Sequence, residues 1–227
     1  MSAPSPITST PPTVENPHRS ERLVYTAFDA DKHDAFLFSM HADPVSWTRA
    51  CSQIQRPMTR AFHEGILRHH NSQLLFVIVN RTSKEEEEEE EEEKLEPVGK
   101  LILDASDPAS TQHGNTELGI GIHRSFQGRG YGGEALRWAL DWAFGYANMH
   151  RVGLTVYEWN EDARRLYEKV GFREEGRKRE ALYLKNRRWD EIFMSVLVHE
   201  WRAMREADCK VPQRILSALI PTHPTHL

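Results

Sequence analysis

Residues 117–136 read ELGIGIHRSFQGRGYGGEAL, and this stretch contains the patterns that decide the fold. Apolar residues first alternate with Glu117, Gly119 and Gly121, which predicts a strand whose second face is almost bare backbone. A glycine-rich loop follows, and from Tyr131 onward the apolar residues recur at helical spacing. Because backbone N–H groups at a helix N-terminus attract anions, this order predicts a phosphate-binding turn.

The glycines of the loop fit two different phosphate-binding patterns. Gly128, Gly130 and Gly133 have the G-x-G-x-x-G spacing of a dinucleotide-binding turn. In such a turn the first glycine follows the strand directly, whereas here residues 123–127 separate the end of the alternating pattern at Ile122 from Gly128. A second pattern, Gln-x-x-Gly-x-Gly, begins at Gln127 and ends at Gly132. The loop alone therefore indicates a phosphate group without saying which one, and it leaves a dinucleotide-dependent oxidoreductase open.

Length and composition indicate one sizeable domain with tails, since the chain has 227 residues, 39% of them apolar. Its two cysteines are widely spaced, and its twelve histidines include no H-E-x-x-H pattern, so we expect no metal site. The longest apolar run, Leu74 to Val79, is too short to cross a bilayer. We expect a cytoplasmic protein, with the nucleus also possible, and neither a membrane nor a nucleic acid as its partner.

Charge and low-complexity segments predict the limits of the folded part. Residues 1–20 have no hydrophobic signal core and are expected to form a disordered leader. Nine consecutive glutamates, Glu85 to Glu93, dominate the net charge of −5 and predict a solvated hairpin insertion at about residues 83–96. The alternative is a functional role for these glutamates, in which their negative charge attracts cationic substrates. The domain is expected over residues 21–203, followed by a C-terminal tail over residues 204–227.

The remaining patterns alternate between period two and helical spacing, which indicates a mixed α/β fold. One helical segment is expected at residues 31–40 together with 46–50, and further helices are expected at residues 59–69, 131–147 and 160–170. Strands are expected at residues 22–30, 74–79, 97–105, 116–126, 150–159, 181–184 and 191–198.

A second motif lies downstream at residues 160–172, NEDARRLYEKVGF. Gln-x-x-Gly-x-Gly after an ELGIGI strand, followed some thirty residues later by this motif, resembles the GNAT superfamily of acyl-CoA N-acyltransferases. The resemblance spans about Arg22 to Trp201, and the ending NRRWDEIFMSVLVHEW is most similar to the branch with ribosomal-protein alanine and spermidine acetyltransferases. It implies the GNAT fold, a central mixed, mostly antiparallel twisted sheet of about six to seven strands flanked by about four helices.

The same resemblance implies a function. The sheet would be splayed in its middle to admit acetyl-CoA as co-substrate, and the enzyme would acetylate a primary amine by direct attack in a ternary complex. The acceptor would be a small amine such as a polyamine, or a peptide N-terminus, and the protein a monomer or homodimer. A non-catalytic acyl-CoA-binding regulator on the same fold is the alternative function.

The resemblance also implies the residues that bind the cofactor. The pantetheine would lie along the splayed strand, where the Ile122 N–H would polarise the thioester carbonyl, and the pyrophosphate would lie in the glycine loop. Asn160 fits either a cofactor contact or a plain helix N-cap. Gly119 and Gly121 alternatively mark a bulge. The expected cofactor-binding residues are Ile120, Gly121, Ile122, Gln127, Gly128, Arg129, Gly130, Tyr131, Gly132, Gly133, Asn160 and Arg165.

Two catalytic residues are expected. Tyr167 corresponds to the family's tyrosine beside the thioester sulfur. A phenol with an ordinary pKa of about 10 suits this role, because it can hydrogen-bond or protonate a leaving thiolate. The alternative is that Tyr167 is a core residue without a catalytic role. Some members carry a glutamate twelve residues earlier, but Thr155 stands there. Glu117 is therefore the expected base, acting through water, with Glu158 and Asp190 as alternatives.

Overall fold

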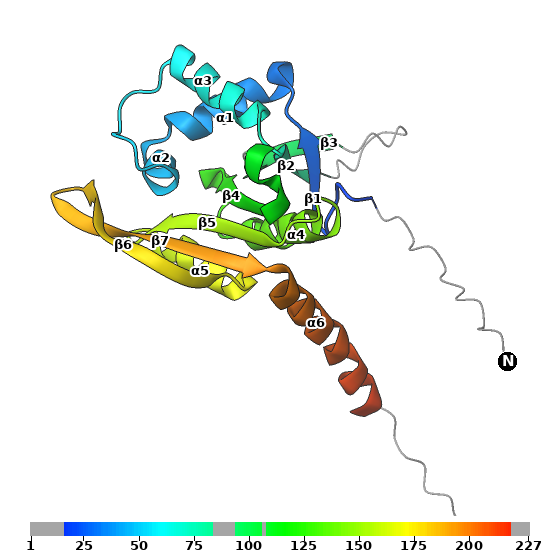
Figure 1. The fold of residues 1–227 in the computed structure, drawn as a ribbon. Helices are drawn as coiled ribbons and strands as arrows, with labels where there is room; N and C mark the ends of the chain where they lie inside the picture. The colour runs from blue at the N-terminus through cyan, green and yellow to red at the C-terminus, as the bar shows by residue number, and fades with distance from the viewer. Residues whose placement is uncertain (1–15, 84–93, 106–107, 219–227) are drawn as a thin grey trace, which may run out of the picture.

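A seven-stranded sheet forms the centre of the protein in the computed structural model, which describes residues 16–83, 94–105 and 108–218 (Figure 1). Its strands are β1 (Leu23–Ala27), β2 (Leu75–Ser83), β3 (Lys94–Leu103), β4 (Asn115–Ile122), β5 (Arg151–Tyr157), β6 (Arg173–Leu184) and β7 (Arg187–Leu197). The helices are α1 (Ala30–Ala42), α2 (Pro44–Ala50), α3 (Arg60–Asn71), α4 (Tyr131–Gly145), α5 (Glu161–Val170) and α6 (Val198–Ala218), with short 3-10 turns at Pro108–His113 and Arg124–Phe126.

The strand order is β1-β2-β3-β4-β5-β7-β6, and every neighbouring pair is antiparallel except β4 and β5. The predicted mixed, mostly antiparallel sheet of six to seven strands is therefore confirmed. The described chain has six α-helices rather than about four, partly because the segment between β1 and β2 forms three helices instead of two. Asp43 explains the extra boundary, since it ends α1 and caps α2 with its own carboxylate.

One strand begins earlier than its sequence pattern predicts. β6 starts at Arg173, although the expected strand covered only residues 181–184. Its pairing with β7 shifts register between Glu174 and Gly176 and again between Lys178 and Leu182. Each irregularity interrupts the alternation of period two, so the first half of the strand carries no strand-like pattern.

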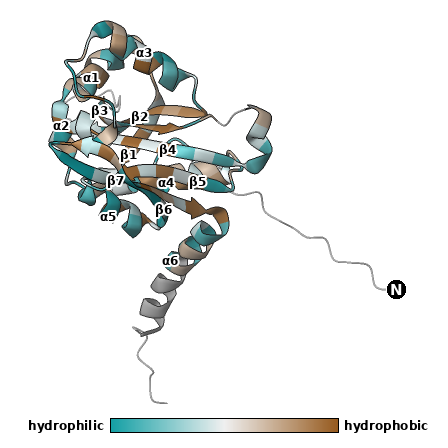
Figure 2. Ribbon diagram, turned by 60° about the vertical axis from the view of Figure 1, so that its left-hand side comes forward, coloured by the Kyte–Doolittle hydropathy of each residue, from teal (hydrophilic) through white to brown (hydrophobic). Residues whose placement is uncertain are grey.

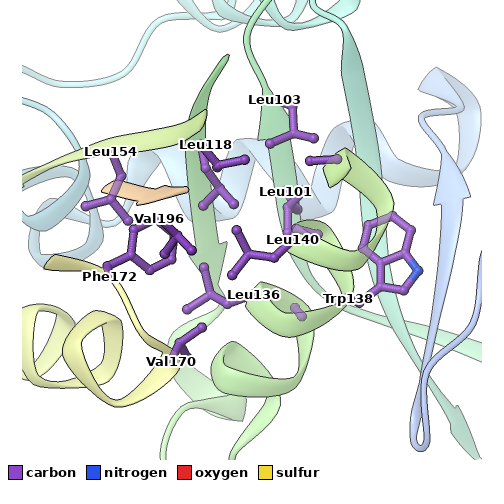
Figure 3. Packing of buried hydrophobic residues seen from close by; sticks show 14 of the residues in the cluster. Leu101, Leu103, Leu118, Leu136, Trp138, Leu140, Leu154, Val170, Phe172 and Val196 are labelled. Carbon is purple, nitrogen blue, oxygen red and sulfur yellow. The ribbon is translucent and has the colours of Figure 1, made fainter. Parts of the chain in front are cut away.

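Helices cover both faces of the sheet (Figures 1 and 2). On one face, Leu136 and Leu140 of α4 pack between Leu101 of β3 and Val196 of β7 (Figure 3). The other face has a smaller apolar cluster in which α1 and α3 cover β2, formed by Leu37, Met40, Leu67 and Ile78. The sheet thus separates a large core under α4 and α5 from a smaller one under α1 and α3.

The predicted ends of the domain stay a prediction, but contacts near them are visible. Pro17, within the expected leader, accepts a hydrogen bond from the Trp138 indole N–H of α4 at 2.8 Å. At the other end, α6 continues to Ala218, and Trp201 donates to Asp141 of α4 at 2.9 Å. The expected acidic insertion lies almost wholly outside the described residues. Among the helices that are described, none combines the length and apolarity needed to cross a membrane.

Gly99 of β3 allows β3 and β4 to approach closely. A Cβ atom there would overlap the carbonyl oxygen of Gly121 and lie 2.8 Å from Ile122 Cδ1. We predict that Gly99→Ala lowers the free energy of unfolding by about 1–3 kcal/mol, because the backbone of β4 would have to move. Urea unfolding measures the effect.

The matched control is Gly176→Ala in β6, where a Cβ atom would meet no described atom within 4 Å. It should leave stability unchanged or slightly raised, since alanine restricts the unfolded chain. Equal effects of the two substitutions would show that the approach at Gly99 is not tight.

Candidate active site

The strands β4 and β5 separate in the middle of the sheet. They pair in parallel only where Asn115–Glu117 meets Arg151–Gly153. β4 continues to Ile122 along β3, whereas β5 continues along β7. A gap therefore opens between the two strands beyond Glu117, which is the splay that the sequence predicted.

The pairing of β4 with β3 decides which backbone groups face this gap. The His123 N–H donates to the Val98 carbonyl of β3 at 2.9 Å. In an antiparallel pair, alternate residues direct both N–H and C=O to the same neighbour. The N–H groups of Ile120 and Ile122 consequently point away from β3 and toward the gap, where no strand of the described chain pairs with them.

Gly121 contributes a bare surface rather than backbone groups. It is the register partner of Lys100, so its N–H and C=O are directed to β3. A Cβ atom at Gly121 would lie 3.1 Å from Met40 Cε and 3.9 Å from Lys100 Cγ. The register of β3 and β4 is continuous here, so Gly119 and Gly121 mark no bulge. The gap arises because β5 diverges, and the bulge interpretation is wrong.

The glycine loop presents a row of unpaired backbone donors. Within the described chain, no acceptor is bonded to the N–H groups of residues 128–133. Gly128 and Gly130 have φ angles of +75° and +84°, a conformation that favours glycine, and Tyr131 begins α4. Consecutive donors at the N-terminus of a long helix form an anion site.

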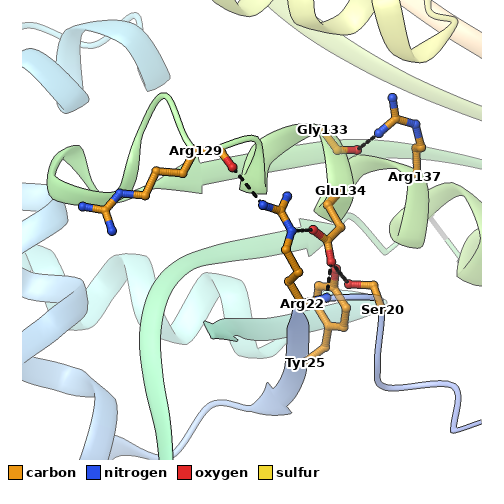
Figure 4. Close-up of polar contacts among 7 residues, drawn as sticks. All are labelled: Ser20, Arg22, Tyr25, Arg129, Gly133, Glu134 and Arg137. Carbon is orange, nitrogen blue, oxygen red and sulfur yellow. Dashed lines mark hydrogen bonds and ion pairs between the residues drawn. The ribbon is translucent and has the colours of Figure 1, made fainter. Parts of the chain in front are cut away.

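Polar and charged contacts hold the loop in place (Figure 4). Glu134, in the first turn of α4, accepts hydrogen bonds from Ser20 Oγ at 2.8 Å and from the Arg22 backbone N–H at 2.7 Å. Its second oxygen pairs with Arg22 Nε at 2.8 Å, and Arg22 Nη1 donates to the Arg129 carbonyl at 3.2 Å. The start of β1 therefore supports the loop from behind.

Two loop side chains predicted to bind the cofactor fold back on the protein. Gln127 Nε2 donates to the Ile122 carbonyl at 2.9 Å and so fixes the loop to the end of β4. Arg129 Nη2 donates to the Ser125 carbonyl at 3.1 Å, and its guanidinium lies over the Phe126 ring. Arg129 thus keeps a positive charge beside the free amides.

Tyr167 lies on the apolar side of α5, with its ring edge against Phe172 and a centroid separation of 5.8 Å. No group of the described chain bonds its hydroxyl. Burial raises the pKa of Tyr167 to about 12, so the phenol keeps its proton at neutral pH. The ring packs against the core, as the alternative interpretation required, but the hydroxyl remains available as a donor.

Asn160 is the N-cap residue of α5, as expected, but its side chain makes no capping hydrogen bond. Its Nδ2 instead donates to the Arg49 carbonyl of α2 at 3.3 Å, and the neighbouring Trp159 donates to the Thr48 carbonyl at 3.0 Å. These two bonds hold α2 against the turn between β5 and α5. Arg165, by contrast, is engaged by carboxylates of its own helix, Glu161 and Asp162.

Glu117 lies at the closed end of the gap. Its carboxylate, in a side chain that is 50% exposed, pairs with Arg151 at 3.3 Å, and partial burial raises its pKa. It lines a cavity of about 310 Å³ together with Asp104 and His113. Because residues alternate across a strand, Glu117 points to the face opposite the core that contains Tyr167.

The two alternative bases are engaged in the structure. Asp190 accepts from the Glu180 backbone N–H at 2.9 Å, and this bond is the main reason why its pKa is lowered. Glu158 accepts from the Asp190 backbone N–H at 2.9 Å. A carboxylate with a lowered pKa is a weak base, so Asp190 suits the role poorly.

Sequence reasoning missed a buried polar chain on the side of α1 and α3. Lys100 Nζ lies 2.6 Å from His41 Nε2, His41 Nδ1 lies 2.9 Å from His63 Nδ1, and His63 Nε2 lies 2.9 Å from Asp34 Oδ1. The four residues come from three separate elements and form no motif. A lysine within the apolar run VGKLIL was the one sequence signal that could have revealed it.

A cavity of about 310 Å³ lies beside these hydrogen-bonded side chains. His41 forms part of its wall, and Trp47 and Arg56 come from α2 and the segment that follows. Its wall contains no carboxylate, and no described group of three or more histidine, cysteine or acidic residues could hold a metal ion.

Comparison with known proteins gives consistent matches. A family model described as an acetyltransferase (GNAT) domain matches residues 22–173. Spermidine N(1)-acetyltransferase of Escherichia coli (strain K12) is 30% identical over 91 residues, which are 40% of this chain and 49% of that protein. A Bacillus subtilis (strain 168) protein provisionally named ribosomal N-acetyltransferase YdaF is 34% identical over 85 residues, 37% of this chain and 46% of its own length. The matches thus span about half the length of these curated relatives.

A solved structure extends the likeness to the whole fold. The crystal structure of spermidine N-acetyltransferase from Vibrio cholerae, in complex with CoA and spermine, superposes with a TM-score of 0.65 at 22% identity. The superposition covers 80% of this chain and 99% of the other. It confirms the predicted fold.

The role of Asn160 can be tested by exchanging its amide for a carboxylate. Aspartate caps helices as well as asparagine does, but it cannot donate to the Arg49 carbonyl. We predict that Asn160→Asp lowers the free energy of unfolding by about 0.5–1.5 kcal/mol, as measured by chemical denaturation.

The reverse exchange at a genuine cap is the control. Asp29 accepts a hydrogen bond from the Asp31 N–H at 3.0 Å at the start of α1. Asp29→Asn keeps this acceptor and should be nearly neutral. An Asn160→Asp variant as stable as the parent would argue for a capping role.

Proposed function

The chain belongs to the acetyltransferase (GNAT) domain family, and on this basis we propose that it uses acetyl-CoA to acetylate a primary amine by direct attack in a ternary complex. The observation that carries the proposal is a line of unpaired backbone donors in two groups, one on β4 and one at the start of α4. Ile120 and Ile122 direct N–H groups into the gap, and residues 128–133 follow with free amides at the start of α4. A long ligand with amide groups at one end and a pyrophosphate at the other fits this line.

The described residues suit the chemistry of acetyl-CoA in two ways. An extended chain with amide groups can add to an exposed strand edge as a further strand would, and β4 offers such an edge. A pyrophosphate would be held by the amides of residues 128–133 and by the helix dipole of α4, with Arg129 adding a positive charge. When bound, acetyl-CoA supplies the activated acyl group.

The chain's own residues would then stabilise charge as it develops. The Ile122 N–H would donate to the thioester carbonyl oxygen, as an oxyanion hole does. The Tyr167 hydroxyl would donate to the departing sulfur. Because the pKa of about 12 for Tyr167 lies several units above the value of about 8.5 for an ordinary thiol, a hydrogen bond to the thiolate is favoured over complete proton transfer.

The amine would approach from the side of α1, α2 and α3. The cavity beside His41 lies on that side and is lined by Trp47 and Arg56. A guanidinium repels the additional ammonium groups of a polyamine, whereas it attracts the carbonyl or carboxylate groups of a peptide. Of the two acceptor classes, this cavity therefore favours a peptide N-terminus.

A thiol-release assay with acetyl-CoA tests the proposal against polyamines and short peptides with free N-termini. Release that depends on an added amine, with acetyl-amine product detected by mass spectrometry, would support it. Binding of acetyl-CoA without release on any amine would instead favour a non-catalytic acyl-CoA-binding regulator on the same fold.

Tyr167→Phe removes the donor and keeps the ring in the core. We predict that kcat falls about 100-fold or more, because one positioned donor to developing negative charge contributes about that much, while the affinity for acetyl-CoA measured by calorimetry changes little.

Tyr146→Phe is the matched control, since Tyr146 is 62% exposed at the end of α4. It should retain full turnover. If Tyr167→Phe also retained full turnover, Tyr167 would be a packing residue.

A further inference from the structure

We propose that the buried chain on the side of α1 and α3 is a proton path that carries the proton lost by the acceptor amine from Lys100 to the surface. This path consists of Lys100, His41, His63 and Asp34. The inference rests on the proposed acetyl transfer and deepens it, because it assigns the base that Glu117, Glu158 and Asp190 do not clearly supply.

The hydrogen bonds of the path run in one direction. Asp34 can only accept as a carboxylate, so His63 Nε2 carries the hydrogen in their 2.9 Å bond. His63 Nδ1 is then an acceptor, and His41 Nδ1 must donate to it at 2.9 Å. His41 Nε2 in turn accepts from Lys100 Nζ at 2.6 Å. Every bond thus points from Lys100 toward Asp34, as a proton relay requires.

The two histidines are sealed, whereas Asp34 at the far end of the path reaches the surface. His41 and His63 are 6% and 0% exposed, so neither ring exchanges protons freely with water. Asp34 is 34% exposed and pairs with Arg60 at the surface, and Lys100 keeps partial exposure. A proton can therefore enter at Lys100 and leave at Asp34.

The surroundings of Lys100 favour its neutral form. The groups that face it are His41 of α1, His70 of α3 and the Cys51 thiol after α2. None of these described neighbours is a carboxylate that could stabilise the ammonium form. Burial lowers the pKa of Lys100 to about 7, and burial also lowers the pKa values of His41 and His70. A neutral amine at neutral pH has a lone pair with which to accept a proton.

Lys100 also lies beside the strand that faces the gap. It is the register partner of Gly121, which lies between Ile120 and Ile122. The aliphatic part of Lys100 lies against this face of β4, since a Cβ atom at Gly121 would be in ordinary contact with Lys100 Cγ and Cε, at 3.9 and 4.0 Å. The base is thus adjacent to the backbone that is proposed to hold the thioester.

The proton balance of the step is complete. The amine nitrogen forms a bond to the acetyl carbon while the carbon–sulfur bond breaks. The proton lost by the nitrogen passes to Lys100 Nζ, and the path releases one proton from Asp34 to water. The departing thiolate, held by Tyr167, takes one proton from water, so the net charge is unchanged.

Lys100→Met tests the base directly, because methionine fills similar volume but cannot accept a proton. With acetyl-CoA and the best amine from the acceptor panel, we expect kcat of the parent protein to rise with pH through about 7. The variant should lose this rise and about 100-fold of kcat or more, with unchanged acetyl-CoA affinity. Lys185→Met, in the exposed turn between β6 and β7, should behave as the parent does.

Asp34→Asn interrupts the far end of the path and leaves Lys100 in place. We expect a smaller loss of kcat, with the KM for acetyl-CoA unchanged. A Lys100→Met variant with the parent's pH profile would overturn the proposal. So would an acetyl group found on Lys100 by mass spectrometry, because Lys100 would then be a nucleophile rather than a base.

A stability measurement separates this inference from the proposed function. The pKa of Lys100 is lower in the folded state, about 7, than in an unfolded chain, about 10.4. Between these values the unfolded chain binds more protons, so the folded state gains stability as pH rises. The parent should show this gain relative to Lys100→Met, as measured by urea unfolding at pH 6 through 10.

The stability measurement and the acetylation assay together distinguish failure of the proton path from failure of the proposed function. A stability difference that does not depend on pH would overturn the proton path even if acetyl transfer occurs. A pH-dependent difference without acetylation of any amine would show a neutral Lys100 in a protein whose proposed function has failed, and the path would fail with it.

Discussion

The separation of β4 from β5 beyond Glu117 is the constraint on which the rest of the site depends. Arg151 holds the closed end together, because it pairs with Glu117 at 3.3 Å and with Glu175 of β6 at 2.5 Å. Ser195 of β7 also donates to Glu175 at 2.6 Å. Four strands are thereby tied at one end of the gap. Beyond this point β4 follows β3 while β5 follows β7, and the backbone donors of β4 face a space that no described strand fills.

The two faces of the sheet contribute different chemistry to this gap. α4 and α5 supply the free amides of the loop and the Tyr167 hydroxyl, whereas α1 and α3 supply the polar chain that ends at Lys100. Burial acts on both groups through the same physical effect, since a low-dielectric environment disfavours charge. It raises the pKa of Tyr167 to about 12 and lowers that of Lys100 to about 7. The proposed acid is therefore neutral near pH 7, and the proposed base is neutral in about half of the molecules.

Much of the fold could be predicted from the sequence because its signals are local. Glycine spacing located the loop, periodicity located α4 and α5, and a left-handed Gly171 ends α5 as expected, with φ of +117°. Errors arose where periodicity fails. The irregularities of β6 hid its first half, and Asp43 divided what looked like one helical segment into α1 and α2. Asn160 was ambiguous because a position before a helix does not say which partner the side chain will have.

The sequence by itself determined the family, the strand, loop and helix that could hold a phosphate, and the position of Tyr167 on an apolar helix face. Each motif behind these features spans about twenty residues or fewer. Only the tertiary structure decided which amides are unpaired, which face of the sheet Glu117 occupies, and which buried side chains Lys100 contacts. Lys100 and His41 are 59 positions apart, and their contact exists only after α1 packs on the sheet. Burial and long-range contacts set the protonation states of Lys100 and Tyr167, and no local sequence pattern predicts these contacts.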